Sequence, residues 1–179
     1  MTSFGYSSEG NDLNELLLTL STATSVGSLA VTRGEILLGE MTVDPARTQS
    51  ELLLPAIEDL LSHLDLTADN IDYFAAVVGP GTFTGLRVGV ATIKGLALAT
   101  GKKVVGVSSL QSLALQVPEV SYPVYALLDA RKGEVYSCKY QWENGLPLQI
   151  GNERVLDPST LLDEIDGEAL FIGDGAVVY

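Results

Sequence analysis

The segment "GPGTFTGLRVGVATIKGLALATG", residues 79–101, constrains the fold more than any other part of the chain. It follows the apolar run "YFAAVVG", which is too short for a buried helix and therefore predicts a central strand. The segment itself reads as a helix that is apolar or small on nearly all sides, interrupted only by Arg87 and Lys94. Such a helix is covered on two sides. We therefore expect a strand, a turn and a helix inside a layered α/β domain.

The glycines of the turn do not match a known phosphate-binding loop. No Lys-Ser or Lys-Thr pair follows Gly85, as a P-loop requires, and the spacing of Gly79, Gly81 and Gly85 differs from that of the dinucleotide fingerprint. The sequence of the turn therefore does not predict a specific phosphate-binding site.

The helix after the turn has two apolar faces. One stripe is expected to lie on the sheet, and the second face consists of small and apolar residues that let another helix approach closely. The residues of this second face are Gly85, Val88, Gly89, Thr92, Gly95, Leu96 and Ala99. One interpretation is that this second face packs on nothing more than the chain's own helix at residues 47–64. Its apolar area exceeds what one neighbouring helix can cover, which favours an interface with a partner. The predicted partner-binding residues on the two helices are Leu52, Ala56, Gly85, Val88, Gly89, Thr92 and Leu96.

Charge and cysteine content narrow the class of protein. The chain has 179 residues, with 10 basic and 23 acidic side chains and a formal net charge of −13. This charge opposes unaided docking on nucleic acid, whose affinity for proteins comes largely from Lys and Arg. Cys138 is the one cysteine and cannot form an internal disulfide. No cationic leader or membrane-length apolar run is evident, so we expect a cytoplasmic protein that does not bind membranes.

The order of predicted elements repeats along the chain. Residues 1–15 are poor in apolar side chains and are expected to form a mobile tail. Two cycles of three strands, a helix and a strand follow, and "GDGA" at residues 173–176 stands where "GPGT" stood in the first cycle. We predict two tandem three-layer α/β units at residues 16–106 and 107–179, the second incomplete at its C-terminal end. The predicted strands are 16–20, 27–32, 35–43, 73–79, 103–107, 123–129, 134–142, 148–156 and 169–175, and the helices are 46–64, one that follows the strand at 73–79 and ends near Thr100, one beginning near Ser108, and 158–165.

Four stretches resemble, in order and spacing, the bacterial TsaB (YeaZ) family. They are "LLTLSTAT", "RTQSELLLPAIEDLL", "GPGTFTGLRVGVATIKGLALATGKKVVGVSSLQSLA" and "LLDARKGEVY". The resemblance implies the duplicated RNase H-like fold of the actin-like ATPase superfamily. It also implies a cytoplasmic subunit of the machinery that places threonylcarbamoyladenosine in tRNA beside the anticodon. Members of that family bind the catalytic paralogue TsaD and work with the ATPase TsaE.

Residues that a catalytic relative would need are replaced in this chain. Active members of the superfamily carry an aspartate at the end of the first strand, where Ser21 stands here, and a hydroxyl supplies no charge to a magnesium shell. The family's histidine before "TQ" is Arg47, and the single histidine of the chain is His63. A metal site of the paralogue's type needs two imidazoles, so we expect no metal and no peptidase activity.

Several residues keep two interpretations. Asp129, followed by Arg131 and Lys132, is either a remnant of a phosphate-binding hairpin or an ordinary charged turn, and the turn is favoured. Gly173 in "GDGA" could face an adenosine, but a short glycine turn is weak evidence. Cys138 is read as a small core residue. The residues that could face a nucleotide as vestiges of such a site are Ser21, Gly79, Gly81, Asp129 and Gly173.

The sequence thus predicts a non-catalytic scaffold or activator that binds a TsaD-like paralogue together with a TsaE-like ATPase. It would form a homodimer in isolation, meet tRNA only through the complex, and have no cofactor of its own, with ATP or ADP only at the interface with the partner. Two alternatives stay open. One is a weak ATPase or carbamoyltransferase that uses Asp129 and the glycine turns, and the other is a domain that dimerises for structural reasons alone.

Overall fold

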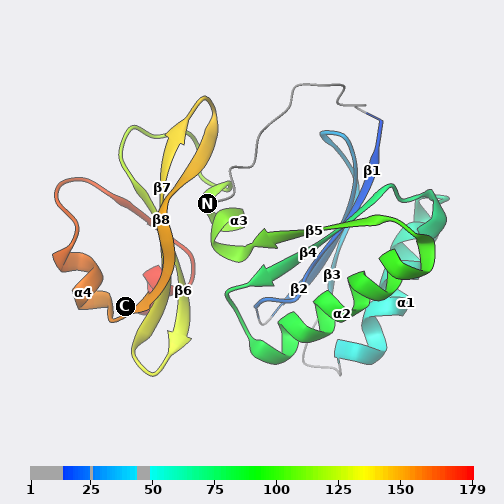
Figure 1. Ribbon diagram of the computed structural model, residues 1–179, viewed down its shortest axis with the longest axis horizontal. Helices are drawn as coiled ribbons and strands as arrows, with labels where there is room; N and C mark the ends of the chain where they lie inside the picture. The colour runs from blue at the N-terminus through cyan, green and yellow to red at the C-terminus, as the bar shows by residue number, and fades with distance from the viewer. Residues whose placement is uncertain (1–13, 25, 44–48) are drawn as a thin grey trace.

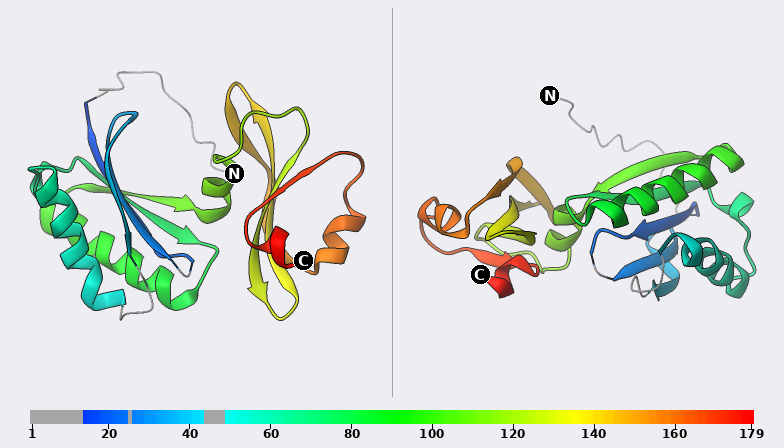
Figure 2. Two further views of the ribbon diagram at one scale, coloured as in Figure 1. Left: turned by 180° about the vertical axis from the view of Figure 1, so that it is seen from behind. Right: turned by 90° about the horizontal axis from the view of Figure 1, so that it is seen from below.

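Two β-sheets, each carrying its own helices, lie side by side and are joined through a short helix (Figures 1 and 2). The computed structural model describes residues 14–24, 26–43 and 49–179, without the side chains of residues 49–52. Residues 1–13 of the tail predicted at 1–15, the predicted helix start at Ala46 and the position of Arg47 lie outside the described residues.

The first sheet has the strand order β3-β2-β1-β4-β5. β2 is antiparallel to both β1 and β3, whereas β4 is parallel to β1 and β5. Parallel neighbours need a crossover, and helices α1 and α2 supply it. The elements are β1 (Leu16–Ser21), β2 (Gly27–Arg33), β3 (Ile36–Val43), α1 (Gln49–His63), the 3-10 turn η1 (Ala68–Asn70), β4 (Tyr73–Gly79), α2 (Phe83–Thr100) and β5 (Lys103–Ser108).

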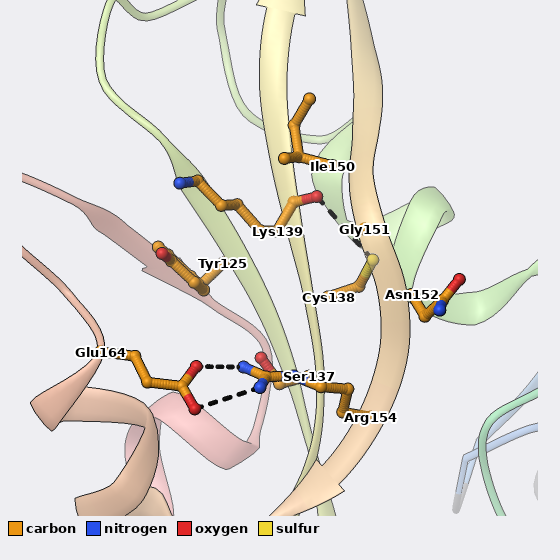
Figure 3. A pocket seen from close by; sticks show the side chains of 9 residues that line it. All are labelled: Tyr125, Ser137, Cys138, Lys139, Ile150, Gly151, Asn152, Arg154 and Glu164. Atoms are coloured by element: carbon orange, nitrogen blue, oxygen red, sulfur yellow. Dashed lines mark hydrogen bonds and ion pairs between the residues drawn. The ribbon is translucent and has the colours of Figure 1, made fainter.

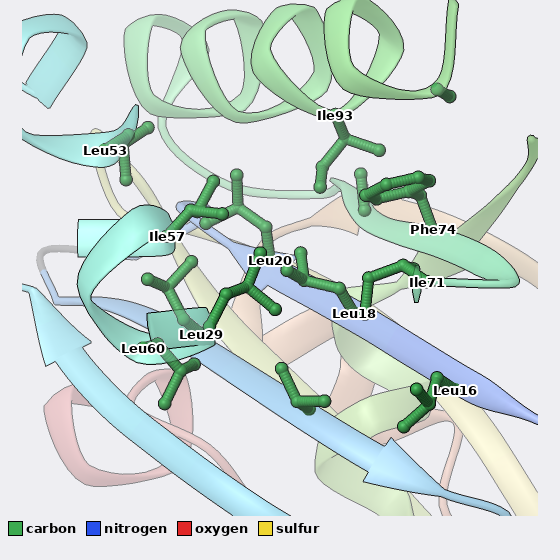
Figure 4. Close-up of a cluster of buried hydrophobic side chains, with 14 of the residues drawn as sticks. Leu16, Leu18, Leu20, Leu29, Leu53, Ile57, Leu60, Ile71, Phe74 and Ile93 are labelled. Atoms are coloured by element: carbon green, nitrogen blue, oxygen red, sulfur yellow. The ribbon is translucent and has the colours of Figure 1, made fainter. Parts of the chain in front are cut away.

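The first core forms where both helices press on one face of this sheet (Figure 4). Alternate leucines of β1 point to that face because side chains of a strand alternate, and Leu18 and Leu20 are almost completely buried. Leu53 and Ile57 of α1 and Ile93 of α2 close the layer from above. Burial of each such side chain contributes about 1.5–3 kcal/mol, so this layer sets the position of both helices.

The ends of α2 follow sequence signals. Gly101 adopts a left-handed conformation with φ of 71° and terminates the helix, as glycine does at this position.

α1 continues through Pro55 although proline lacks the N–H of an interior helix residue. In the described part of the chain, no helix combines the length and apolar content needed to cross a bilayer.

The second sheet repeats the first four strand positions, in the order β8-β7-β6-β9. β7 is antiparallel to β6 and β8, and β9 is parallel to β6. The duplicated α/β architecture predicted from the sequence is therefore confirmed. The elements are α3 (Ser109–Ala114), β6 (Val124–Arg131), β7 (Glu134–Glu143), β8 (Leu146–Leu156), α4 (Pro158–Asp163), β9 (Leu170–Ile172) and α5 (Gly175–Val178).

Helix α3 lies between the two sheets, as Figure 1 shows. The hydroxyl of Ser108 accepts hydrogen bonds from the backbone N–H groups of Leu110 and Gln111, so Ser108 is the predicted cap of this helix. Ser108 also donates to Glu153 on β8, and Ser109 donates to the carbonyl of Pro80 before α2. The unit boundary predicted after residue 106 falls inside β5, which continues to Ser108.

Candidate functional site

The predicted partner surface lies on α1 and α2, and the structure divides its residues into two groups. Ala56, Val88 and Leu96 are half-buried and pack against the first core, and Thr92 is half-buried with its hydroxyl bonded to the carbonyl of Val88. Gly85 and Gly89 are buried. Leu52 belongs to α1, but its side chain is outside the described residues.

Gly85 and Gly89 face the interior, and their assignment to an outer surface was wrong. A Cβ atom added to Gly89 would lie 2.1 Å from Oγ1 of Thr22, and one added to Gly85 would lie 2.1 Å from the carbonyl oxygen of Thr22. Thr22 is 2% exposed, and its hydroxyl donates to the carbonyl of Gly85 at 2.7 Å. Glycine is therefore required at both positions because the turn after β1 packs on them, and not because a partner helix packs there.

The solvent face of α2 is rotated relative to the predicted face. Gly95 is exposed, and a Cβ atom added there would meet nothing within 4 Å. Leu98 is 85% exposed, and Ala91 lies on the same side of the helix. Phe83 at the start of α2 is 70% exposed, with the guanidinium of Arg87 4.3 Å from its ring centroid. This set of small and apolar residues, which we call the outer α2 face, is available for contact with another molecule.

The sequence contained a signal for the outer α2 face that a helical wheel alone does not reveal. Ala91, Gly95 and Leu98 are apolar or small, yet the pattern also allowed Gly85 and Gly89 to be the outward side. The residue that decides between the two is Thr22, in the "STAT" stretch, because it packs against both glycines.

The turn before α2 is held by this same stretch of the chain. The N–H of Thr82 donates to the carbonyl of Ala23 at 2.7 Å, and a Cβ atom on Gly81 would lie 2.3 Å from that oxygen. Gly79 is buried and has φ of 121°, which favours glycine. The backbone of the β1–β2 turn thus lies against the start of α2.

The hairpin with Asp129 is engaged in hydrogen bonds within the second unit. Its carboxylate accepts from the backbone N–H of Arg131 at 2.8 Å and from the Tyr179 hydroxyl at 3.3 Å. The N–H of Asp129 donates to the carboxylate of Asp174 at 3.0 Å. Gly173 has φ of 106°, and a Cβ atom there would lie 2.0 Å from the carbonyl oxygen of Leu127. These contacts describe a folded hairpin beside a tight glycine turn.

A cleft of about 290 Å³ opens between the two sheets. Of the five possible nucleotide-facing residues, Ser21 lines this cleft and the other four do not. Its lining is neutral, since it consists of hydroxyl, amide and aliphatic side chains: Ser21, Thr24, Ser28, Ser109, Ser112, Gln116, Ala23, Val26, Val77, Leu113 and Leu128. Among the described residues, this lining offers hydrogen bonds but no carboxylate for a magnesium ion and no acid–base pair.

Metal-ligating side chains are not gathered in the described residues. There, no group of three or more His, Cys, Asp and Glu residues lies close enough to hold an ion. The Nδ1 atom of His63 is 2.7 Å from the carbonyl oxygen of Asp59, one helical turn earlier. Cys138 is 2% exposed, in agreement with its reading as a core residue.

Comparison with known proteins gives consistent matches. The family model described as TsaD, tRNA N6-adenosine threonylcarbamoyltransferase, matches residues 43–170. The "tRNA threonylcarbamoyladenosine biosynthesis protein TsaB" of Bacillus subtilis is 30% identical over 88% of this chain and 70% of its own length. The protein of the same name from Escherichia coli is 32% identical, over 89% of this chain and 71% of that protein.

A solved structure has the same fold. YeaZ from Pseudomonas aeruginosa superimposes with a TM-score of 0.79 at 33% sequence identity, covering 90% of this chain and 76% of that one.

Proposed function

This chain belongs to the TsaB (YeaZ) family, and we propose that it acts in tRNA threonylcarbamoyladenosine biosynthesis as a non-catalytic subunit. In this proposal it binds a TsaD-like catalytic paralogue and works with a TsaE-like ATPase. It meets tRNA through the complex, because a net charge of −13 opposes direct docking on phosphates. As a subunit of a tRNA-modifying complex, it would be cytoplasmic.

The observation that supports a scaffold role most strongly is the outer α2 face. Leu98 is 85% exposed on a helix whose other side is fully committed to the first core. Gly95 beside it leaves open space where another helix could approach to close distance. Leu54 on α1 is also exposed, at 47%. An apolar area of this kind on a stable domain is typical of a protein interface.

The proposed surface is therefore a revised version of the one predicted from sequence. It keeps Val88, Thr92 and Ala56 at its half-buried border and Gly95 of the predicted second face, drops Gly85 and Gly89, and adds Leu98. When the paralogue is absent, we expect the same surface to pair two copies of this chain as a homodimer.

The test is co-expression with the TsaD-like paralogue of the same genome, followed by size-exclusion chromatography with light scattering. We expect a stable complex with the native chain and its loss in Gly95→Arg and Leu98→Asp. Leu162→Asp on α4, where the leucine is 58% exposed, is the matched control and should leave the complex intact. A complex that survives both α2 variants would exclude this surface, and failure of the native chain to bind the paralogue would exclude the scaffold role.

An enzyme remains the second candidate, because the matching family model is described as a transferase. In this alternative, Asp129 and the glycine turns would serve a weak ATPase or carbamoyltransferase. Purified protein should then hydrolyse ATP with magnesium, and Asp129→Ala should abolish the turnover. Under the scaffold proposal the native protein alone is inactive, and any ATP or ADP would bind at the interface with the partner.

A further inference from the structure

A second cavity lies in the second sheet, and its lining shares no residue with α2 or with the cleft between the sheets. Figure 3 shows the side chains that line it. Its volume is about 380 Å³, within the range of small-molecule sites. Side chains of β6, β7 and β8 form its floor and walls, and the residue that ends α4 closes one side.

An irregularity of β8 builds this cavity. Ser137 pairs with Arg154 and Lys139 pairs with Ile150, so three residues of β8 stand opposite Cys138 alone. The extra residues make β8 bulge away from β7. Since residues two apart on a strand share a face, Ser137 and Lys139 point to the same side as their cross-strand partners. Arg154 and Lys139 are thereby brought to one face of the sheet.

The floor of the cavity is rigid and partly polar. Tyr125, the partner of Lys139 on β6, is 7% exposed and stacks on Phe171 with ring centroids 5.8 Å apart. Ser137 is 2% exposed and places its hydroxyl in the cavity lining. A flat apolar group could therefore lie on the tyrosine ring, with a hydroxyl donor beside it.

The charges at the rim are unusual for so acidic a chain. Lys139 places its Nζ atom 5.9 Å from the centroid of Tyr125 and forms no ion pair within the described ranges. Arg154 donates two hydrogen bonds to Glu164, at 3.1 and 2.5 Å. The lining therefore carries one net positive charge, in a protein whose net charge is −13.

We propose that this cavity binds a small organic anion, a carboxylate or a phosphate monoester with a flat apolar group. The anionic group would contact Nζ of Lys139 and the N–H donors of Arg154 that Glu164 does not use, while the apolar group rests on Tyr125. Guanidinium and ammonium groups form strong charge-assisted hydrogen bonds with both anions. Glu164 competes for Arg154 and so weakens the site. This inference does not depend on the proposed scaffold function.

The experiment is a titration of the ¹⁵N-labelled chain with phenyl phosphate, benzoate and neutral benzyl alcohol, followed by amide chemical shifts. We expect saturable shifts at residues 137–139 and 150–154 with the anions and none with the alcohol. Tighter binding of phenyl phosphate identifies a phosphate monoester site, and tighter binding of benzoate a carboxylate site. Absence of saturable shifts with both anions would overturn the proposal.

Three variants and a control test the assigned roles. Lys139→Gln and Arg154→Gln keep the aliphatic parts of the side chains, and each should weaken binding at least tenfold because a charge-assisted hydrogen bond is lost. Glu164→Gln should strengthen binding severalfold because it frees Arg154. Lys132→Gln, at the exposed tip of the hairpin, should leave the affinity unchanged. Unchanged affinity in Lys139→Gln or Arg154→Gln, or weaker binding in Glu164→Gln, would refute the assignment.

Discussion

Replacement of single glycines on α2 by alanine tests which side of this helix faces inward. Gly89 and Gly95 occupy the same helix, and both substitutions add one methyl group. At Gly89 the new Cβ atom would lie 2.1 Å from Oγ1 of Thr22 and 3.4 Å from its Cγ2, whereas at Gly95 it would meet nothing within 4 Å. The two variants therefore share a change in helix propensity and differ in packing.

The magnitudes follow from these contacts. Alanine is favoured over glycine inside a helix by about 1 kcal/mol, so Gly95→Ala should raise the free energy of unfolding by about that amount. In Gly89→Ala the same gain is opposed by overpacking, about 1–3 kcal/mol. Displacement of Thr22 would also break its buried hydrogen bond to the carbonyl of Gly85, at about 1–3 kcal/mol. The net loss of stability is about 3 kcal/mol, which corresponds to a fall in Tm of roughly 6–12 °C for a chain of this size.

Thermal and urea unfolding monitored by circular dichroism measure both effects. Thr22→Ala removes Oγ1 and Cγ2, which would lie 2.1 and 3.4 Å from the new Cβ atom, so the double variant Thr22→Ala/Gly89→Ala should be more stable than Gly89→Ala alone. Non-additivity of this kind reports a direct contact. If Gly89→Ala is instead as stable as Gly95→Ala, then Thr22 does not pack on Gly89, and the face predicted from sequence is the outer one.

Three further predictions concern single side chains. Cys138 is 2% exposed and burial raises the pKa of its thiol, so Ellman's reagent should label it only after unfolding, and fast labelling of the native protein would contradict this burial. Burial also raises the pKa of Tyr140, whose hydroxyl has no hydrogen-bond partner among the described residues. Tyr140→Phe should therefore leave the free energy of unfolding in urea equal, or higher by up to about 1 kcal/mol. A large loss of stability would reveal a hidden partner of the hydroxyl. Hydrogen bonds from the side chain and backbone of Ser159 lower the pKa of Asp157, the cap of α4. The ionised carboxylate of Asp157 therefore stabilises the fold at pH values above its pKa in the unfolded state, near 4. This stabilisation is lost as the pH falls through the lower pKa of the folded state. Asp157→Ala should accordingly lower Tm at pH 7 and not at pH 2, and an equal effect at both pH values would speak against the cap.

The order of elements was predictable because burial imposes a period on the sequence. Leu16, Leu18 and Leu20 alternate along β1, and Leu53 and Ile57 recur at helical spacing in α1. The spacing therefore predicts whether each segment is a strand or a helix, and which of its faces is buried. The second cycle could be found in the same way, since its strands and turns repeat the first.

The inward side of α2 could not be found in this way, because glycine carries no side chain whose burial a pattern would reveal. Gly85 and Gly89 are compatible with a partner helix, with the chain's own helix, or with the turn at Thr22, and only the path of that turn decides. The cavity beside Tyr125 was missed for a related reason. The cavity depends on the register between β7 and β8, where three residues of β8 lie opposite one residue of β7. The sequence of either strand alone does not determine this register.

The two glycine turns, "GPGT" and "GDGA", bear on nucleotide binding, since each follows a strand of its unit. In the first turn, the N–H of Thr82 is bonded to the carbonyl of Ala23. In the second, the carboxylate of Asp174 accepts from the N–H of Asp129, so two acidic side chains lie beside this turn. The N–H of Thr82 is therefore already paired in the first turn, and the negative charge beside the second turn repels an added anion.

We therefore expect no shift in Tm of the isolated chain with 1 mM MgATP. A ligand at one hundred times its Kd would add about 2.7 kcal/mol to the free energy of unfolding, or roughly 5–11 °C in Tm, so the absence of any shift bounds Kd well above 10 µM. Asp174→Asn, which removes one of the two charges, serves as the comparison. A shift of several degrees in the native chain would mean that the turns open to admit nucleotide, and the scaffold proposal would then have to include a nucleotide site of this chain's own.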